Sequence, residues 1–423
     1  MSGAAPKGPR LGLGLSEDVD LLRFEQQARA IEAAPGPAPA TPREWIRQNL
    51  FSGPVNSLLT LASGVFVLFL AYQILSFVFV SAQWEVVQVG MRGYMIGSFP
   101  VDEAWRVWAS AYLVIILAGL SYGVSARRLR PSAGQVAVGA AAAAVAGAVV
   151  FFTAQTPLVR GLAAGATPAA IAGALVGRLF GRKILRPLIV AWVLVFPAIM
   201  IIVRGFVGVP PSEWGGFFFN IIAATVGIVA SFPLGLLLAL GRRSEMPVIR
   251  IASVGFIELF RGVPLVAWLI FSKFVVDLLL PPQMVIPDII KAFLVMTFFS
   301  AAYIGEIVRG GLQGVPAGQY EAARALGLST TRMMALIVLP QALRSTIPAM
   351  ISHFISLFKD TSLFVAIEVT DLLAAARRSA SSLLYFGTDM ETLLFAGLIF
   401  WAVAFSMSRW SQRLEVRLGV GRR

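Results

Sequence analysis

Two oppositely charged side chains are neighbours in a stretch of sequence that is otherwise apolar enough to lie in a membrane. Lys359 and Asp360 fall within the apolar run 346–370, and Thr361 and Ser362 follow them. Ionisable groups within a span cost roughly 2.5–3.5 kcal/mol on insertion scales, so they usually face a cavity or a partner. The pair can therefore bind a polar solute or join neighbouring helices, and the sequence leaves both interpretations open.

The same run has a polar face. His353, Ser356 and Asp360 recur at helical spacing, so one side of a helix presents all three. For His353 alone we favour a hydrogen-bonded packing role. Polar residues of two other predicted spans are candidates for the same path: Asn220, Thr297 and Ser300. Small polar residues in spans serve close helix packing more often than transport, so we favour a packing role for these three residues.

Several chemistries are excluded by residue content. The chain has no cysteine, and His353 is its only histidine, which excludes disulfides, Cys/His metal clusters and Cys–His catalysis. No lysine follows a glycine and precedes Ser or Thr, so the Walker A phosphate loop is absent. We find no nucleophile with a base, which argues against a membrane enzyme. If ATP drives this protein, another chain hydrolyses it, and we expect no metal or cofactor on this one.

Composition predicts the fold class. The 423 residues are 57% hydrophobic and 13% charged, with a mean hydropathy of +0.79; soluble chains have about 45–50% apolar and about 25% charged residues. The excess extends over the whole length, which predicts an all-α integral membrane protein, a polytopic helical bundle. The net charge of +13 comes from basic residues that flank apolar runs, so we expect a membrane and no nucleic-acid partner.

Apolar runs of spanning length recur along the chain, and we expect about ten transmembrane helices. They lie near 55–81, 107–124, 133–153, 158–177, 187–203, 216–240, 253–280, 288–308, 346–370 and 391–410. The Gly- and Ala-rich run 158–177 is the weakest. The four arginine-rich clusters of the chain all fall on the cytoplasmic side only if the run 158–177 crosses the membrane. If it crosses, both chain ends also lie inside. Arg377 and Arg378 break the rule, because they fall outside in this arrangement.

The chain divides by composition into three parts. We expect residues 1–46 to form a flexible cytoplasmic tail. We expect no signal peptide, because the first long apolar run begins near Val55. Residues 47–213 form an N-terminal transmembrane extension. Residues 214–423 form a core in which polar residues are more organised.

The cytoplasmic loop 309–345 carries the most informative pattern. Pro316 can start a short helix because its missing N–H falls at an unpaired position. Gly327 permits a sharp reversal, and Ser329 can cap a second helix that we expect to run to Pro340. The product is a helix–turn–helix that protrudes into the cytoplasm. On its first helix, small alanines would fit closely in a partner's groove and charged residues would pair at the rim: Glu321, Ala322, Ala323 and Arg324.

This loop resembles the EAA loop of the membrane subunits of ATP-binding-cassette importers. The signature is present as Glu321-Ala322-Ala323, Gly327 and Ile337-x-Leu339-Pro340. In that family the loop docks into the ATPase subunit and transmits ATP-driven closure to the membrane helices. The resemblance therefore implies a coupling role for these residues and for Arg324.

Three more segments resemble polar amino-acid permeases: Glu258–Pro264, Tyr303–Gly311 and Lys359–Leu363. The resemblance covers roughly 214–415 and implies a type I importer permease core of five spans. By length and layout, the extension resembles the long membrane subunits of general L-amino acid importers (glutamate/glutamine/aspartate/asparagine-type). Charged residues near the cytoplasmic ends of these segments are candidates for a gate or loop anchor: Glu258, Arg261, Glu306 and Arg309.

The resemblance implies the permease subunit of an ATP-driven importer in a bacterial inner membrane. It implies polar substrates, with a preference for acidic and amide amino acids, whose ammonium and carboxylate Lys359 and Asp360 would match. The implied partners are ATPase subunits holding ATP and Mg, a second, paralogous permease subunit, a periplasmic solute-binding protein and lipid. An ion-coupled secondary transporter using Asp360 would show an internal repeat, and we see none. The intramembrane charges argue only weakly against a non-transporting scaffold.

Overall fold

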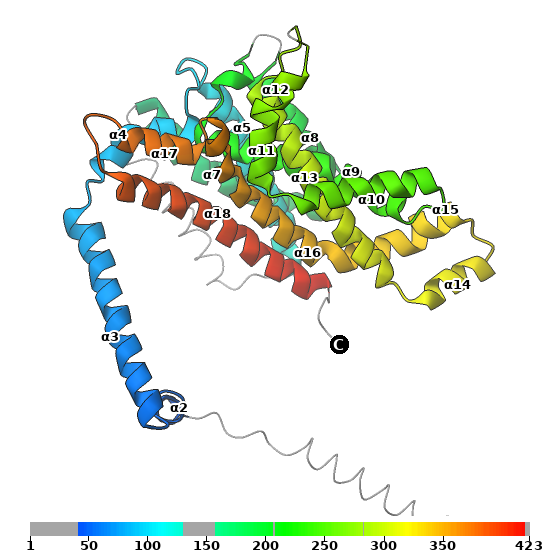
Figure 1. Cartoon of the computed structure of the whole chain (residues 1–423), viewed down its shortest axis with the longest axis horizontal. Helices are drawn as coiled ribbons and strands as arrows, with labels where there is room; N and C mark the ends of the chain where they lie inside the picture. The colour runs from blue at the N-terminus through cyan, green and yellow to red at the C-terminus, as the bar shows by residue number, and fades with distance from the viewer. Residues whose placement is uncertain (1–40, 130–156, 206–207, 282, 419–423) are drawn as a thin grey trace, which may run out of the picture. The chain divides into compact units, whose positions relative to one another are not determined.

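The computed structural model describes residues 41–129, 157–205, 208–281 and 283–418 (Figure 1). These residues form helices and no named strand. Among them, seven helices are long and apolar enough to cross a membrane, or up to nine if each bent pair is one span. The predicted span 133–153 lies outside the described residues. The all-α membrane class is confirmed, and the count of about ten spans stays a prediction.

The first of two compact units is Met1–Ala82. Its helix α2, Pro42–Asn49, begins at a capping box in which Thr41 and Glu44 bond each other's backbone N–H. Part of the predicted flexible tail 1–46 is therefore helical. The unit continues with α3, Pro54–Ser76, and the π-helical turn η1, Phe77–Ser81. This element is apolar on every side and buries none of its most apolar window, as expected for a lipid-facing span.

The second unit, Gln83–Arg423, contains all the remaining helices. Those of the predicted extension are α4 (Glu85–Ile96), α5 (Trp105–Leu129), α7 (Pro157–Phe180), the 3₁₀ turn η2 (Gly181–Ile184) and α8 (Leu185–Val203). Helices α5 and α7 touch backbone to backbone, because a Cβ on Gly123 would lie 2.0 Å from the Ala174 carbonyl oxygen. The Gly- and Ala-rich run thus forms a helix of spanning length.

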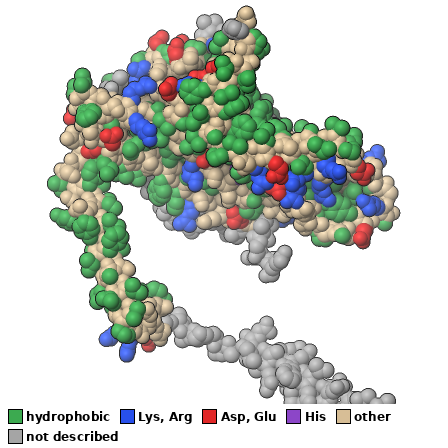
Figure 2. Space-filling model, viewed as in Figure 1, with side chains coloured by type: hydrophobic (Ala, Val, Ile, Leu, Met, Phe, Trp, Pro, Cys, Tyr) green, Lys and Arg blue, Asp and Glu red, His purple; other side chains and the backbone are tan. Residues whose placement is uncertain are grey.

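The predicted core follows. Its helices are α9 (Gly216–Arg242), α10 (Pro247–Gly262), α11 (Leu265–Phe274), α12 (Val276–Leu279), α13 (Asp288–Gln313), α14 (Ala317–Ala325), α15 (Thr330–Met333), α16 (Leu339–Asp360), α17 (Leu372–Ala380) and α18 (Asp389–Leu418). Helix α13 is the central one: it packs on α9, α10, α11 and α16. Figure 1 shows α14 and α15 at one end of this bundle and α17 at the other. In Figure 2, charged side chains gather at the α10, α14 and α15 end, and hydrophobic ones cover much of the face between the ends.

The predicted span 253–280 is wrong as a continuous helix. Helices α10 and α11 meet at a bend of 99°. Val263 at the break is extended, with φ −122° and ψ 137°, because the ring of Pro264 disfavours the helical conformation in the residue before it. Helix α10 therefore turns away from the direction of α11.

The second hairpin helix does not end at Pro340, as the sequence predicted. Helix α15 passes through a π-helical turn, η4 (Met334–Val338), directly into α16, and the whole element spans Thr330–Ile367. In the π turn the Leu339 N–H donates to the Met334 carbonyl, five residues back. Pro340 then sits in the first turn of α16, where a proline is tolerated. The hairpin and the predicted substrate-lining span are one continuous element.

Candidate functional site

The hairpin forms largely as its turn signals predict. Pro316 is the N-cap of α14, and Gly327 adopts the left-handed conformation, with φ +73°, that a reversal needs. Ser329 occupies the N-cap position of α15, but its side chain makes no capping hydrogen bond, so that detail of the prediction is wrong.

Helix α14 has an inner and an outer face. Ala323 is 1% exposed and packs inside the chain with Leu312 and Val338, so the expectation that both alanines face a partner is wrong for Ala323. Ala322 is on the outer face, with the charged Glu321 and Arg324. Leu326, immediately before the turn, is 78% exposed. The sequence reasoning missed it, although a large apolar residue beside a turn glycine is a visible signal.

Hydrogen bonds tie α14 to the spanning helices. The guanidinium of Arg243, the C-cap residue of α9, donates to the Tyr320 hydroxyl (3.2 Å), which donates in turn to the Leu312 carbonyl of α13 (3.1 Å). On the other side, Gln341 of α16 donates to Gln319 (3.1 Å). The α14 helix is therefore tied to α9, α13 and α16 together.

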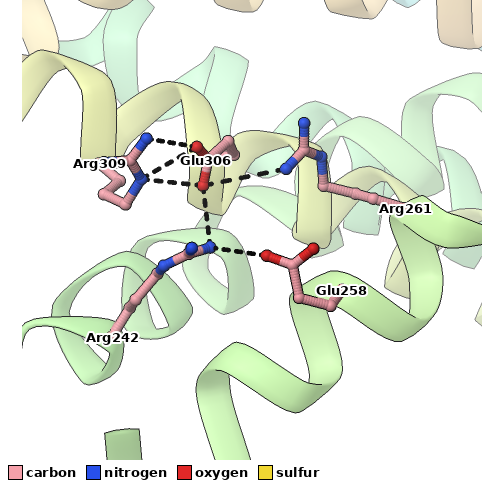
Figure 3. A network of polar contacts seen from close by, with 5 residues as sticks. All are labelled: Arg242, Glu258, Arg261, Glu306 and Arg309. Atoms are coloured by element: carbon pink, nitrogen blue, oxygen red, sulfur yellow. Dashed lines mark hydrogen bonds and ion pairs between the residues drawn. The ribbon is translucent and has the colours of Figure 1, made fainter.

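A charged cluster lies where α13 approaches the loop (Figure 3). At its centre, Glu306 accepts hydrogen bonds from Arg309 Nε (2.9 and 3.0 Å) and from Arg242 (3.1 Å). The guanidinium of Arg261 approaches to 4.0 Å, and Arg242 also donates to Glu258 (3.3 Å). The structure thus brings together all four residues predicted as a gate or loop anchor. It adds Arg242, which was not among the residues predicted for this site.

This cluster is partly shielded from solvent. The side chains of Glu306, Arg242 and Arg309 are 22–25% exposed. Charge-assisted hydrogen bonds are stronger than neutral ones, and more so when partly desolvated. The cluster joins the ends of α9, α10 and α13, so the three helices are held together at this end.

A second polar chain runs deeper in the bundle. Ser300 donates to Ser231 (2.9 Å) and bonds His353 Nε2 (2.9 Å), which joins α13 to α9 and α16. The His353 ring stacks on Tyr303 at 5.3 Å, and the Arg261 guanidinium lies 5.4 Å from the same tyrosine ring. These contacts agree with the packing role favoured for His353, and Tyr303 connects them to the charged cluster.

At the other end of the bundle, Asn220 is fully buried and fully bonded. It donates to Thr361 Oγ1 (3.0 Å) and Asp371 Oδ2 (3.3 Å) and accepts from the Leu372 N–H (3.0 Å). Asp371 also caps α17 through the Ala374 N–H (2.8 Å). Burial raises the pKa of the Asp371 carboxyl to about 6, and the hydrogen bonds from Ala374 and Asn220 offset this only in part. Asn220 and Thr361, both predicted for the substrate path, thus bond to this corner, where the sequence reasoning missed Asp371.

The remaining predicted path residues are near these contacts but outside them. Lys359 and Ser356 are exposed on this chain, Asp360 and Ser362 are half-buried, and Thr297 is buried in α13. Within the described part of the chain, neither Lys359 nor Asp360 makes an ion pair or a side-chain hydrogen bond. No group of His, Cys, Asp or Glu suited to a metal ion occurs among the described residues either.

Comparison with known proteins finds relatives that match most of the chain. The family described as "Binding-protein-dependent transport system inner membrane component" matches residues 231–420. "Inner membrane amino-acid ABC transporter permease protein YhdY" of Escherichia coli is 34% identical over 89% of this chain and 93% of its own length. "Glutamate/glutamine/aspartate/asparagine transport system permease protein BztC" of Rhodobacter capsulatus is 35% identical over 91% of this chain and 96% of its own length. "Probable glutamine ABC transporter permease protein GlnP" of Bacillus subtilis is 37% identical over 48% of this chain and 92% of its own length.

The matches confirm the resemblance that the motifs predicted, including the likeness of the extension to long permease subunits. They decide against the ion-coupled secondary transporter and the scaffold. Since the identity to full-length permeases extends far beyond the 231–420 segment, this chain belongs to the inner membrane components of binding-protein-dependent transport systems, the permease subunits of ABC transporters, and is not itself an enzyme.

Proposed function

We propose that this chain forms part of the pore of an ATP-driven importer for polar amino acids in a bacterial inner membrane. Two long relatives are named as amino-acid permeases, and one name specifies glutamate, glutamine, aspartate and asparagine. We propose the same acidic and amide amino acids as substrates here. Residues 214–423 act as the working core and 47–213 as an extension of it.

The observation that carries this proposal is the way α14 is presented and held. Its outer face offers Glu321, Arg324 and the exposed Leu326, a mixed charged and apolar surface suited to a partner groove. The helix is tied through the half-buried Tyr320 to α9 and α13 and through the exposed Gln319 to α16. An ATPase subunit that binds ATP and Mg and moves α14 would therefore move three spanning helices with it.

The charged cluster around Glu306 acts in this proposal as the cytoplasmic gate. It links α9, α10 and α13 while its ion pairs are closed, and the pull of the ATPase on α14 changes their relative positions. Opening and closing of this end, alternating with the other end, gives alternating access. A second permease subunit completes the pore, and a periplasmic solute-binding protein delivers the substrate.

The substrate passes Lys359 and Asp360. Two adjacent opposite charges that make no ion pair or side-chain hydrogen bond in the described chain can interact with the carboxylate and ammonium of an amino acid in a water-lined cavity. His353, Ser300 and Asn220 support the helices that form this path, since their polar atoms already bond to protein groups.

Uptake by the complete complex tests the proposal. The chain is purified with its ATPase, second permease and binding protein, placed in proteoliposomes and supplied with ATP and labelled amino acids. Glutamate, glutamine, aspartate and asparagine should accumulate, and arginine and leucine should accumulate far less. Glu321→Lys should abolish uptake while leaving membrane insertion intact, and Glu245→Lys, at an exposed acid in the α9–α10 loop, serves as the matched control. Uptake that persists without ATP, or full uptake by Glu321→Lys, would refute the importer mechanism.

A further inference from the structure

A cavity of about 320 Å³ lies between helices α4 and α17 of the second unit. The two helices have 12 and 9 residues, about 18 and 14 Å at 1.5 Å per residue, which is too short for the roughly 30 Å hydrocarbon core. They pack on each other and on α9 and α18. The element Thr330–Ile367 runs from the α14 hairpin to α17, and Figure 1 shows α4 and α17 at the end of the bundle opposite the hairpin. The cavity that their residues line is therefore at that end. With the hairpin on the cytoplasmic side, as in the function proposed above, on which this inference rests, the cavity lies at the outer membrane–water boundary.

The cavity wall combines hydrogen-bond donors with apolar surface. Arg378 uses one N–H to bond Thr370 Oγ1 (3.1 Å), which leaves its other N–H groups and the Thr370 hydroxyl proton available. Ser98 contributes a further hydroxyl, and Val86 and Val89 form an apolar wall. No Asp or Glu is among the lining residues that the structure describes. This composition suits a ligand with an oxyanion at one end and hydrocarbon at the other.

The loop that follows α17 is apolar and unusually exposed. Leu383, Leu384 and Phe386 are 103%, 83% and 84% exposed. Such a group is unfavourable in water and favourable in the hydrocarbon just below the lipid headgroups. With these side chains in hydrocarbon, the neighbouring Arg377 and Arg378 would lie at the depth of the phosphates. That position also accounts for two arginines on the outer side, against the usual charge rule.

The open space in the cavity faces a glycine. A Cβ added at Gly93 of α4 would meet nothing within 4 Å, whereas one added at Gly97 would lie 2.5 Å from the Cα of Gly215. Gly97 therefore allows close packing of α4 on the start of α9. Gly93 leaves room for something that is not part of the chain.

We propose that this cavity binds a phospholipid of the outer leaflet by its phosphate group. Arg378, Thr370 and Ser98 donate hydrogen bonds to the phosphate oxygens. The glycerol and the first acyl carbons lie against Val86, Val89 and the bare backbone at Gly93. The bound lipid fills the gap between the extension helix α4 and the core helix α17, and so acts as a structural ligand.

Native mass spectrometry of the intact purified complex tests the site, with phosphatidylglycerol as the probe. Arg378→Gln removes the guanidinium, and a charge-assisted hydrogen bond is worth enough to weaken lipid retention about tenfold. Gly93→Leu fills the cavity without touching the arginine and should remove the same lipid. Arg377→Gln is the matched control, because Arg377 is also exposed on α17 but does not line the cavity. It should retain the lipid.

Other results would overturn the proposal. Equal lipid retention by Arg378→Gln, Gly93→Leu and wild type would show that the cavity holds no lipid. Displacement of the lipid by excess inorganic phosphate or glutamate would assign the site to a free oxyanion. Weaker binding of the solute-binding protein by Arg378→Gln, with lipid retention unchanged, would make this a protein-docking surface. If Arg378→Gln assembles poorly, Gly93→Leu decides alone.

Discussion

The guanidinium of Arg243 donates a hydrogen bond to the Tyr320 hydroxyl and lies 5.8 Å from the centre of its ring. Arg243 is the C-cap of the spanning helix α9, and Tyr320 lies in the middle of the hairpin helix α14. The same hydroxyl donates to the carbonyl of Leu312 near the end of α13. Tyr320 therefore ties α14 to two spanning helices, and in the proposed mechanism it passes displacement of α14 to both.

Tyr320→Phe should uncouple ATP hydrolysis from uptake. The ring and its packing remain, but both hydroxyl bonds are lost, each worth about 0.5–1.5 kcal/mol. We expect the ATPase to stay bound and the amount of amino acid taken up per ATP to fall roughly two- to tenfold. Gln319→Ala, which removes only the exposed bond to Gln341, should have a smaller effect. An unchanged transport-to-ATPase ratio in Tyr320→Phe would contradict the tether.

Glu306→Gln should destabilise the cytoplasmic end of the bundle. The change leaves three arginines, Arg242, Arg261 and Arg309, close together without their shared carboxylate. We expect a coupling energy of about 0.5–3 kcal/mol between Glu306→Gln and Arg242→Met in a double-mutant cycle of thermal unfolding. Glu258→Gln is the comparison. Because Glu258 is 59% exposed, its substitution should lower the free energy of unfolding by less than about 1 kcal/mol. Additive effects of Glu306→Gln and Arg242→Met would show that the cluster is not a unit.

The hairpin was predictable and the charged cluster only in part, for a physical reason. Pro316 and Gly327 act through their own backbone conformations, so their positions determine the turn locally. The signal for the break at Val263–Pro264 is equally local. The break was missed because the prediction followed the continuous hydropathy of the run and ignored the proline within it. Arg242 meets Glu306 across 64 residues of sequence. That contact depends on how α9 packs on α13, which no local signal specifies.

The same distinction between local and long-range signals applies to the contacts of Asp371. The Asp371 cap on α17 has a local signature, an acid before a run of helix formers. Its bond to Asn220 joins residues 151 positions apart and required the fold. Helices α4 and α17 were not predicted because both are shorter than a span, and a search for spanning runs passes over them.

The buried Asp371 should make stability depend on pH. Its pKa is raised from 3.8 to about 6 by burial, so the folded protein favours the protonated form of this carboxyl more than the unfolded chain does. That stabilisation is complete below about pH 3.8 and is lost as the pH rises through about 6. Asp371→Asn keeps a cap for α17 and cannot ionise, so its Tm should change less than that of wild type between pH 4 and 7. Asp389→Asn, at an exposed carboxylate, should leave the wild-type profile unchanged; a flat wild-type profile would contradict the assignment.

Reporter fusions should resolve the topology. With both ends cytoplasmic, fusions at residues 182, 245, 325 and 418 should report inside, and those at 90, 208, 284 and 380 outside. The fusion at 182 decides whether α7 crosses, because α7 ends just before it. An outside signal at 182 or 325 would be incompatible with this arrangement.

Lys359 and Asp360 should control which amino acids are taken up. A buried pair that braces helices loses its partner on substitution and destabilises the protein, whereas a cavity-facing charge has water as a substitute partner. Neither residue makes an ion pair or side-chain hydrogen bond with another described residue, which argues against a bracing role. We therefore expect the Lys359→Ala and Asp360→Asn complexes to assemble with a yield within about twofold of wild type, because water can replace the lost partner of the remaining charge.

Uptake by these two variants, measured for glutamate, glutamine and arginine in the same proteoliposomes, should fall unequally. Lys359→Ala should impair glutamate most, because it removes the positive charge that an acidic side chain would meet on the path. His353→Gln is the control: a side-chain amide can replace the hydrogen bond between His353 and Ser300, so all three substrates should be affected alike and mildly. Equal loss for every substrate in Asp360→Asn, together with poor assembly, would assign both charges to structure. The path would then have to be sought among the small polar residues of α9 and α13, where Thr297 is buried and makes no side-chain hydrogen bond with another described residue.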